Sequence, residues 1–140
     1  MAKFEISGLD MLIEELEKLA DLTQVAPKMV DAATPILVKN LKNNIQTAVG
    51  SGYATGALVE SVHATDAKMN QYGCFAAVGP TGTDAKGVRN AEKLAYLEYG
   101  TSQNGKRHQS PRPVMARTLH ESEDAVLKKM QEVFDAEVGK

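Results

Sequence analysis

A chain of 140 residues, 43% of them hydrophobic and 24% charged, is long enough for a single globular domain (residues 1–140) with a hydrophobic core of its own. Its formal net charge of −2 argues against a dedicated nucleic-acid-binding protein, and its single cysteine, Cys74, excludes an intramolecular disulfide and a thiolate metal cluster. The N-terminal segment lacks the apolar core of a signal peptide and no apolar run approaches the about 18 residues of a membrane span, so we expect a soluble, intracellular protein.

The first predicted element is an amphipathic helix near the N-terminus. Ser7, followed three residues later by Asp10, resembles an N-terminal capping pair. The alternating segment 3–7 before it is compatible with a short edge strand. Apolar residues then recur at spacings of three and four, which places them on one helical face. They are Leu9, Leu12, Ile13, Leu16, Leu19 and Ala20.

The sequence next predicts a second helix over about residues 26–48. Pro27 suits its first turn, where a missing backbone N–H costs nothing. Pro35 falls inside the pattern and removes one backbone hydrogen bond, so the helix either kinks there or restarts with Thr34 as a cap. The apolar stripe continues in phase beyond Pro35, which favours a kink. Its members are Val25, Met29, Ala32, Ile36, Leu41, Ile45 and Ala48.

Strands follow a glycine-punctuated break at residues 49–58. The segments 60–67 and 72–79 predict two strands joined by a turn near residues 69–71, and 80–87 reads as a loop. Alternate residues of the second strand share one face, namely Tyr72, Cys74, Ala76 and Val78. Residues 90–99 favour a short helix that Asn90 caps and Gly100 ends, because glycine is common just past a helix end. A strand over 95–99 is the alternative.

The final predicted element is a helix of about 24 residues that begins just after Pro113. Its apolar stripe comprises Met115, Leu119, Val126, Met130, Val133, Phe134 and Val138. The expected fold is therefore α+β: two N-terminal helices, the second long and possibly kinked at Pro35, a small antiparallel sheet, and a long C-terminal helix.

Catalytic patterns are weak in this sequence. Gly82 and Gly87 have the spacing of a phosphate-binding loop, but Val88 and Arg89 stand where that motif needs a lysine and a hydroxyl. The three histidines, at 63, 108 and 120, show no spacing typical of a metal site. We expect no enzymatic activity, no cofactor and no metal; a minor enzyme, in which His108 or His120 acts as a base with Glu98 or Glu121, is a further alternative.

The segment 101–109 is polar throughout and separates two predicted ordered elements. It contains the turn dipeptide Asn104-Gly105 and then Lys106, Arg107 and His108. Beyond it, Arg112 stands between Pro111 and Pro113. A rigid scaffold commonly positions functional loops, which favours a mobile interaction arm for this segment. The alternative is a simple solvated connector.

Four segments, taken in order, resemble a known family. They are "YATGALVESV" (53–62), which matches a T-G-x-L-x-x-S-[IV] pattern, "AAVGP" (76–80), "YLEYGTSQ" (96–103), and "RPVMARTL" (112–119). Together they resemble the neck and tail-completion (head–tail joining) proteins of long-tailed bacteriophages and prophages, over about residues 4–119. The chain departs from that family at Val114, where an aromatic residue is usual, and at Arg117, where a second proline is usual.

The resemblance implies a structural protein of the virion head–tail junction, assembled in the bacterial cytoplasm as a ring through which DNA passes. The implied partners are further copies of the chain, the head-completion or connector proteins, and the tail-tube or tail-terminator proteins. The matched residues Glu98, Gly100 and Thr101 would form the base of the loop, with Gly100 at a positive φ. The expected contact residues are Glu98, Gly100, Thr101, Lys106, Arg107, His108, Arg112 and Pro113. The alternatives are a simple helix stop at Gly100 and a small nucleic-acid-binding module that uses Lys106, Arg107 and Arg112.

Overall fold

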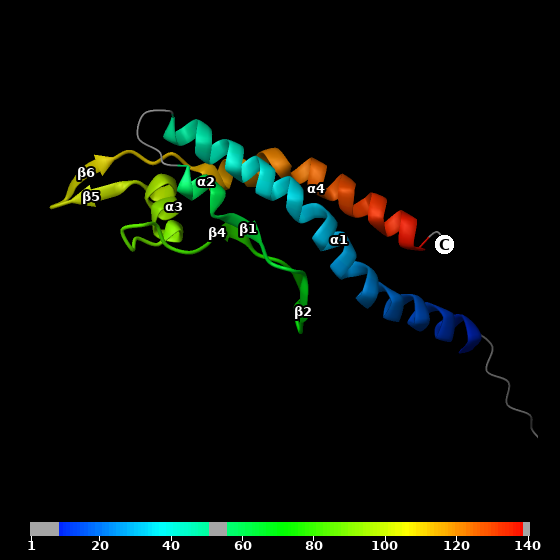
Figure 1. Ribbon diagram of the computed structural model, residues 1–140. Helices are drawn as coiled ribbons and strands as arrows, with labels where there is room; N and C mark the ends of the chain where they lie inside the picture. Colours follow the sequence, from blue (N-terminus) through cyan, green and yellow to red (C-terminus); the bar gives the residue numbers. More distant parts are fainter. Residues whose placement is uncertain (1–8, 51–55, 139–140) are drawn as a thin grey trace, which may run out of the picture.

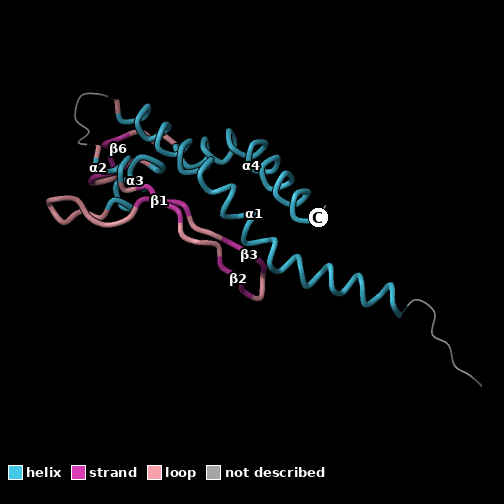
Figure 2. The backbone as a smooth tube through the Cα atoms, turned by 45° about the vertical axis from the view of Figure 1, so that its right-hand side comes forward, coloured by secondary structure: helices cyan, strands magenta, loops and turns pink. Residues whose placement is uncertain are grey.

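The computed structural model describes residues 9–50 and 56–138. The strand expected at 3–7 and the cap expected at Ser7 lie outside these residues. Two long helices lie side by side, and three short β-hairpin ladders and two short helices gather along and beyond one end of that pair (Figure 1). Figure 2 shows the same division between a helical layer and the strands. The α+β class is confirmed.

The first third of the described chain is one continuous helix, α1 (Leu9–Val49), in place of the two helices expected. Pro27 and Pro35 both lie inside it. Pro35 cannot donate to the carbonyl of Asp31, its helical partner four residues back. The hydroxyl of Thr34, which is buried, donates to that carbonyl instead (3.1 Å). The neighbouring side chain thus replaces the missing donor, so the helix does not restart at Thr34.

The hydrophobic core sits where α1 meets the other elements. Leu41 and Ile45 of α1 are almost fully buried against Val62, and α3 (Asn90–Tyr99) and α4 (Val114–Val138) complete the cluster. The last two elements contribute Leu94, Leu97 and Val114. The predicted stripe on residues 26–48 therefore does face the core at its C-terminal end.

The first hairpin comprises two successive ladders rather than one sheet. β1 (Val62–Ala64) pairs antiparallel with β4 (Val78–Pro80), and β2 (Lys68–Asn70) pairs antiparallel with β3 (Gly73–Phe75). The turn falls at residues 71 and 72, one residue later than expected. The backbone N–H of Ala67 donates to the carboxylate of Asp31 (2.8 Å), which ties the hairpin to α1. The antiparallel pairing of these two regions is confirmed, but four short strands replace the two predicted ones, and β2 occupies residues expected at the turn.

Two short helices connect this hairpin to the rest of the fold. α2 (Ala57–Glu60) precedes β1, and α3 confirms the helix favoured over residues 90–99. Asn90 is not its cap, however. The side-chain amide of Asn90 is buried and donates to the carbonyl of Thr81 (2.8 Å), while Arg89 holds the cap position without a side-chain hydrogen bond.

α1 and α4 run antiparallel and meet through a polar seam, defined by Asn40, Asn44, Thr118 and Ser122. Asn40 donates to the hydroxyl of Ser122 (2.8 Å), and Asn44 donates to the hydroxyl of Thr118 (2.9 Å). Thr118 and Ser122 are buried, whereas Leu119, which the apolar stripe placed in the core, is exposed. The stripe was wrong at this position because α4 turns its short hydroxyl side chains toward α1, where only small groups fit at close range.

Candidate interaction surface

The polar segment after Gly100, in which no strand was predicted, is a β-hairpin. β5 (Thr101–Gln103) pairs antiparallel with β6 (Lys106–Gln109), and the register shifts between Thr101 and Ser102. The connecting residues Asn104 and Gly105 have φ values of 53° and 74°, which a two-residue hairpin turn of this hand requires. The hairpin projects from one end of the molecule (Figure 1). Asn-Gly between two short polar runs was the signal that could have predicted it.

Gly100 fixes the direction in which this hairpin leaves α3. Its φ of 75° confirms the expected positive value. A Cβ atom at this position would lie 2.5 Å from the carbonyl oxygen of Gln109 and 3.0 Å from the nitrogen of Pro111. Since both of these are backbone atoms, only glycine allows the two ends of the hairpin to approach so closely.

Glu98, expected at a partner contact, caps α4 from within the same chain. Its carboxylate accepts hydrogen bonds from the backbone N–H of Met115 (2.7 Å) and of Ala116 (3.2 Å). These are first-turn donors that have no partner inside the helix, and the positive end of the helix dipole also favours a carboxylate there. The half-buried side chain of Glu98 therefore stabilises the start of α4.

Replacing Glu98 by alanine should lower the free energy of unfolding by about 1–3 kcal/mol, because two backbone N–H groups in the first turn of α4 lose their charged acceptor. Glu92 is the matched control, since it lies on the same helix and accepts only a surface hydrogen bond from the hydroxyl of Tyr96 among the contacts described. We expect Glu92→Ala to change the free energy by about 0.5 kcal/mol or less. Urea unfolding of both variants measures the difference, and equal losses would remove the capping role of Glu98.

Arg112 has the corresponding role at the end of α1. Its guanidinium donates to the carbonyl of Ala48 in the last turn of that helix, and its backbone N–H donates to the carbonyl of Leu97 (2.6 Å). A cation there complements the helix dipole. Arg112 is thus held at the base of the hairpin, whereas Lys106 lies exposed beside the turn at its tip. Arg107 and His108 lie in β6, Thr101 pairs with Gln109, and Pro113 is exposed directly before α4.

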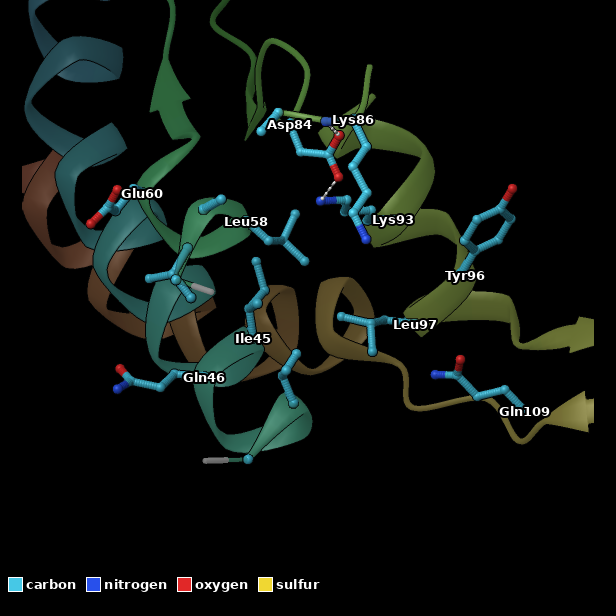
Figure 3. Close-up of a pocket in the computed structure, with 16 residues that line it drawn as sticks. Ile45, Gln46, Leu58, Glu60, Asp84, Lys86, Lys93, Tyr96, Leu97 and Gln109 are labelled. Carbon is cyan, nitrogen blue, oxygen red and sulfur yellow. Dashed lines mark hydrogen bonds and ion pairs between the residues drawn. The ribbon is translucent and has the colours of Figure 1, made fainter. Parts of the chain in front are cut away.

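A cavity of about 890 Å³ opens beside the hairpin, between the end of α1, α2, α3 and the loop at residues 84–86. Figure 3 shows Ile45, Leu58 and Leu97 on its apolar side and the charged Asp84, Lys86 and Lys93 along one edge. Sequence reasoning missed this cavity, because its lining comes from four separate elements.

Asp84 organises the charged edge of the cavity. Its carboxylate accepts the backbone N–H groups of Lys86 (2.8 Å) and Val88 (2.9 Å) and forms an ion pair with the ammonium of Lys93 (2.7 Å). The hydrogen bond from Lys93, followed by the one from Val88, lowers the pKa of Asp84 to about 2. The group is consequently an ionised structural anchor at neutral pH, and it is unsuited to act as a general base there.

This lowered pKa predicts a pH dependence. A carboxylate with a depressed pKa stabilises the fold above its unfolded value, and that contribution is lost as pH falls through about 2. The stability difference between wild type and Asp84→Asn should therefore be largest above about pH 4 and should shrink toward pH 2. Urea midpoints across this range test it; parallel profiles for the two proteins would show that Asp84 does not couple protonation to folding.

Within residues 9–50 and 56–138, no group of three or more His, Cys, Asp or Glu side chains is arranged to hold a metal ion. In the same part of the chain, no helix combines the length and the apolar character that a membrane crossing needs. Comparison with protein-family models, with curated proteins and with solved structures finds no match to this chain.

Proposed function

We propose that this protein is a structural subunit of the head–tail junction of a long-tailed bacteriophage or prophage. It serves in the neck or in tail completion, assembles as a ring with further copies of itself, and joins head-completion or connector proteins to tail-tube or tail-terminator proteins. DNA is its passing cargo. The protein has no catalytic activity and needs no cofactor in this role.

The observation that carries the proposal is the convergence of the four segments that resemble this family. Val62, Leu97 and Val114, which come from three of the segments, are buried in one core cluster. The remaining segment, residues 76–80, contains β4, which pairs with β1 at Val62. Glu98 of the third segment also caps the helix that the last segment begins. Segments that resemble the family by chance would not be expected to contact one another. Segments that belong to a shared fold would.

A second observation favours an assembly subunit over a free-standing domain. Large apolar side chains remain exposed along much of the molecule, and a neighbouring subunit would cover such a surface. They include Met11, Leu16, Met69, Tyr72, Phe75, Tyr99, Leu119 and Leu127. Two-stranded ladders also leave backbone groups unpaired at their edges, where another chain can add.

The test is genetic, in the phage or prophage that encodes the chain. A stop codon early in its reading frame should yield DNA-filled heads and complete tails that remain separate in electron micrographs. A plasmid copy of the wild-type protein should restore joined particles. Joined particles in the absence of the protein, or a block before DNA packaging, would contradict the proposal.

A hairpin-trimmed variant separates assembly from folding. Replacing residues 102–108 by a short turn leaves the core cluster around Leu41, Ile45 and Val62 in place, so the melting temperature should change by only a few degrees. The trimmed protein should nevertheless fail to restore joined particles if the hairpin contacts a neighbour. Normal virion yields would identify the hairpin as a connector only.

The alternative function is a small nucleic-acid-binding module. The observation in its favour is the projecting hairpin with Lys106 exposed beside its turn, because a two-stranded ribbon can enter the major groove of DNA. Arg112, tied to the carbonyl of Ala48, contributes less to such a surface than the sequence suggested. DNA binding by the isolated protein that weakens steeply with salt would favour this alternative.

A further inference from the structure

One end of α1 projects beyond the body of the molecule. α4 accompanies α1 only as far as the ion pair between Glu137 and Lys28 (3.1 Å), close to the end of α4 at Val138. Residues 9–22, hereafter the overhang, continue past that point (Figures 1 and 2). At about 1.5 Å per residue, the overhang is about 20 Å long.

The overhang is apolar on one face and acidic elsewhere. Leu12 is 50% exposed, Ile13 45% and Leu16 54%, so these members of the predicted apolar stripe do not face the core of their own chain. The same 14 residues carry five carboxylates (at 10, 14, 15, 17 and 21) and one lysine (at 18), a net charge of −4. An amphipathic helix with this much uncovered apolar surface is typical of a docking element.

The opposite end of the molecule carries the opposite charge. Residues 84–117, hereafter the basic end, contain seven lysines and arginines and three carboxylates, a net charge of +4. They comprise the 84–89 loop, α3, the β5–β6 hairpin and the start of α4, which lie together at the end farthest from the overhang (Figure 1). Charge is therefore segregated along the length of the molecule.

The basic end also offers apolar surface. Tyr99 is 79% exposed and Tyr96 42% exposed, and tyrosines of this kind commonly anchor protein interfaces. Tyr96 lines the cavity whose apolar wall includes Leu58 and Leu97 (Figure 3). An apolar helix face with acidic flanks thus finds both apolar contacts and opposite charge at this end.

Charge decides which partner covers the overhang. Pairing with the overhang of a second copy would place net charges of −4 against each other, and a membrane surface with anionic lipids would repel it in the same way. The basic end of a second copy attracts it. We propose that copies of this chain associate head to tail, with the overhang of one seated against the basic end of the next.

This inference rests on the proposed ring assembly and defines its contact. Each copy has one donor surface, the overhang, and one acceptor surface, the basic end. Such a heterologous contact leaves one free surface of each kind at the two ends of every short oligomer, so it propagates. It closes into a ring when the rotation between successive subunits returns to the first one.

Two variants of the full chain test the arrangement. A donor-broken protein carries Leu12→Lys and Leu16→Lys, and an acceptor-broken protein carries Lys86→Glu, Arg89→Glu and Lys106→Glu. All five side chains are exposed, so both variants should keep the far-ultraviolet circular dichroism and melting temperature of the wild type. Sedimentation equilibrium across a concentration series then gives the molar mass of each.

The wild-type mass should rise with concentration above the 15.1 kDa of a monomer, while each variant alone stays at that value. An equimolar mixture of the two variants should form a one-to-one pair, because the intact overhang of one still fits the intact basic end of the other. The pair should dissociate as NaCl is raised from about 0.05 M to about 0.5 M, over which screening shortens the reach of charge attraction.

Three results would overturn the head-to-tail contact. The first is self-association of the acceptor-broken protein alone, which would indicate pairing between overhangs. The second is a mixture of the two variants that stays monomeric. The third is a wild-type protein that is monomeric at every concentration. None of these decides the proposed function, which depends on whether heads join tails. Separate heads and tails in the stop-codon mutant, together with overhang pairing in solution, would retain the junction role and reject only this contact.

Discussion

Ile45→Asp should leave the protein largely unfolded. Ile45 is 0% exposed, at the centre of the cluster that joins α1 to Val62 and Leu97. Placing an unpaired carboxylate there costs several kcal/mol, whereas the whole free energy of unfolding of a domain is only about 5–15 kcal/mol. Circular dichroism and the soluble yield after expression measure the loss.

Leu119→Asp is the matched control for that substitution. The sequence pattern placed Leu119 in the core, but it is 62% exposed on the outer side of α4. The same change of a large apolar residue to aspartate should therefore shift the free energy of unfolding by no more than about 0.5 kcal/mol. Unfolding of this variant would mean that α4 presents a different face to α1.

Gly100→Ala should produce the second largest loss. The substitution meets two costs at once: a positive φ, which disfavours any residue with a Cβ by about 1–2 kcal/mol, and overlap with the backbone of Gln109 and Pro111, of similar size. Because backbone atoms cannot rotate away, the base of the hairpin must shift. A lowered urea midpoint, with changed near-ultraviolet signals from Tyr96 and Tyr99, is the expected result.

Gly105→Ala separates the two costs. Gly105 has nearly the same φ, 74°, but nothing lies within 4 Å of an added Cβ. Only a conformational cost applies at Gly105, whereas the backbone of Gly100 (φ 75°, ψ 179°) lies in a region almost confined to glycine and also meets the overlap. The loss at Gly105 should therefore be smaller than that at Gly100. Equal losses at both positions would show that the close approach to Gln109 has no energetic weight.

The sequence predicted those features that depend on local pattern. Apolar residues at helical spacing identified α4 and the buried part of α1, because burial against a single surface selects that period. The short helix that ends at Gly100 and the positive φ of that residue followed from the chemistry of helix ends. The antiparallel pairing after residue 60 was found from alternation, although its division into four short strands was not.

Features that depend on contacts between distant residues were not predictable in this way. The union of two expected helices into α1 depends on the hydroxyl of Thr34 replacing one donor at Pro35. The exposure of Leu119 depends on how α4 is rotated against Asn40 and Asn44. Glu98 and Arg112 were selected as contact residues, and both cap helices that are remote in sequence. The β5–β6 hairpin is a different case. The dipeptide Asn104-Gly105 was recognised as a turn, but the hairpin that this dipeptide favours was not inferred from it.

The polar seam between α1 and α4 sets how far the overhang reaches. Sliding α4 along α1 by one turn, about 5.4 Å, would separate Ser122 from Asn40 and Thr118 from Asn44. Because the seam residues repeat every four positions on both helices, the shifted helices could re-form only one of the two hydrogen bonds. Each buried group left without a partner costs about 1–3 kcal/mol, so the observed alignment is favoured over the shifted one. The spacing between successive subunits in an assembly would then be set by residues that lie outside both docking surfaces. A substitution in the seam could alter the diameter or pitch of the assembly while leaving both docking surfaces unchanged.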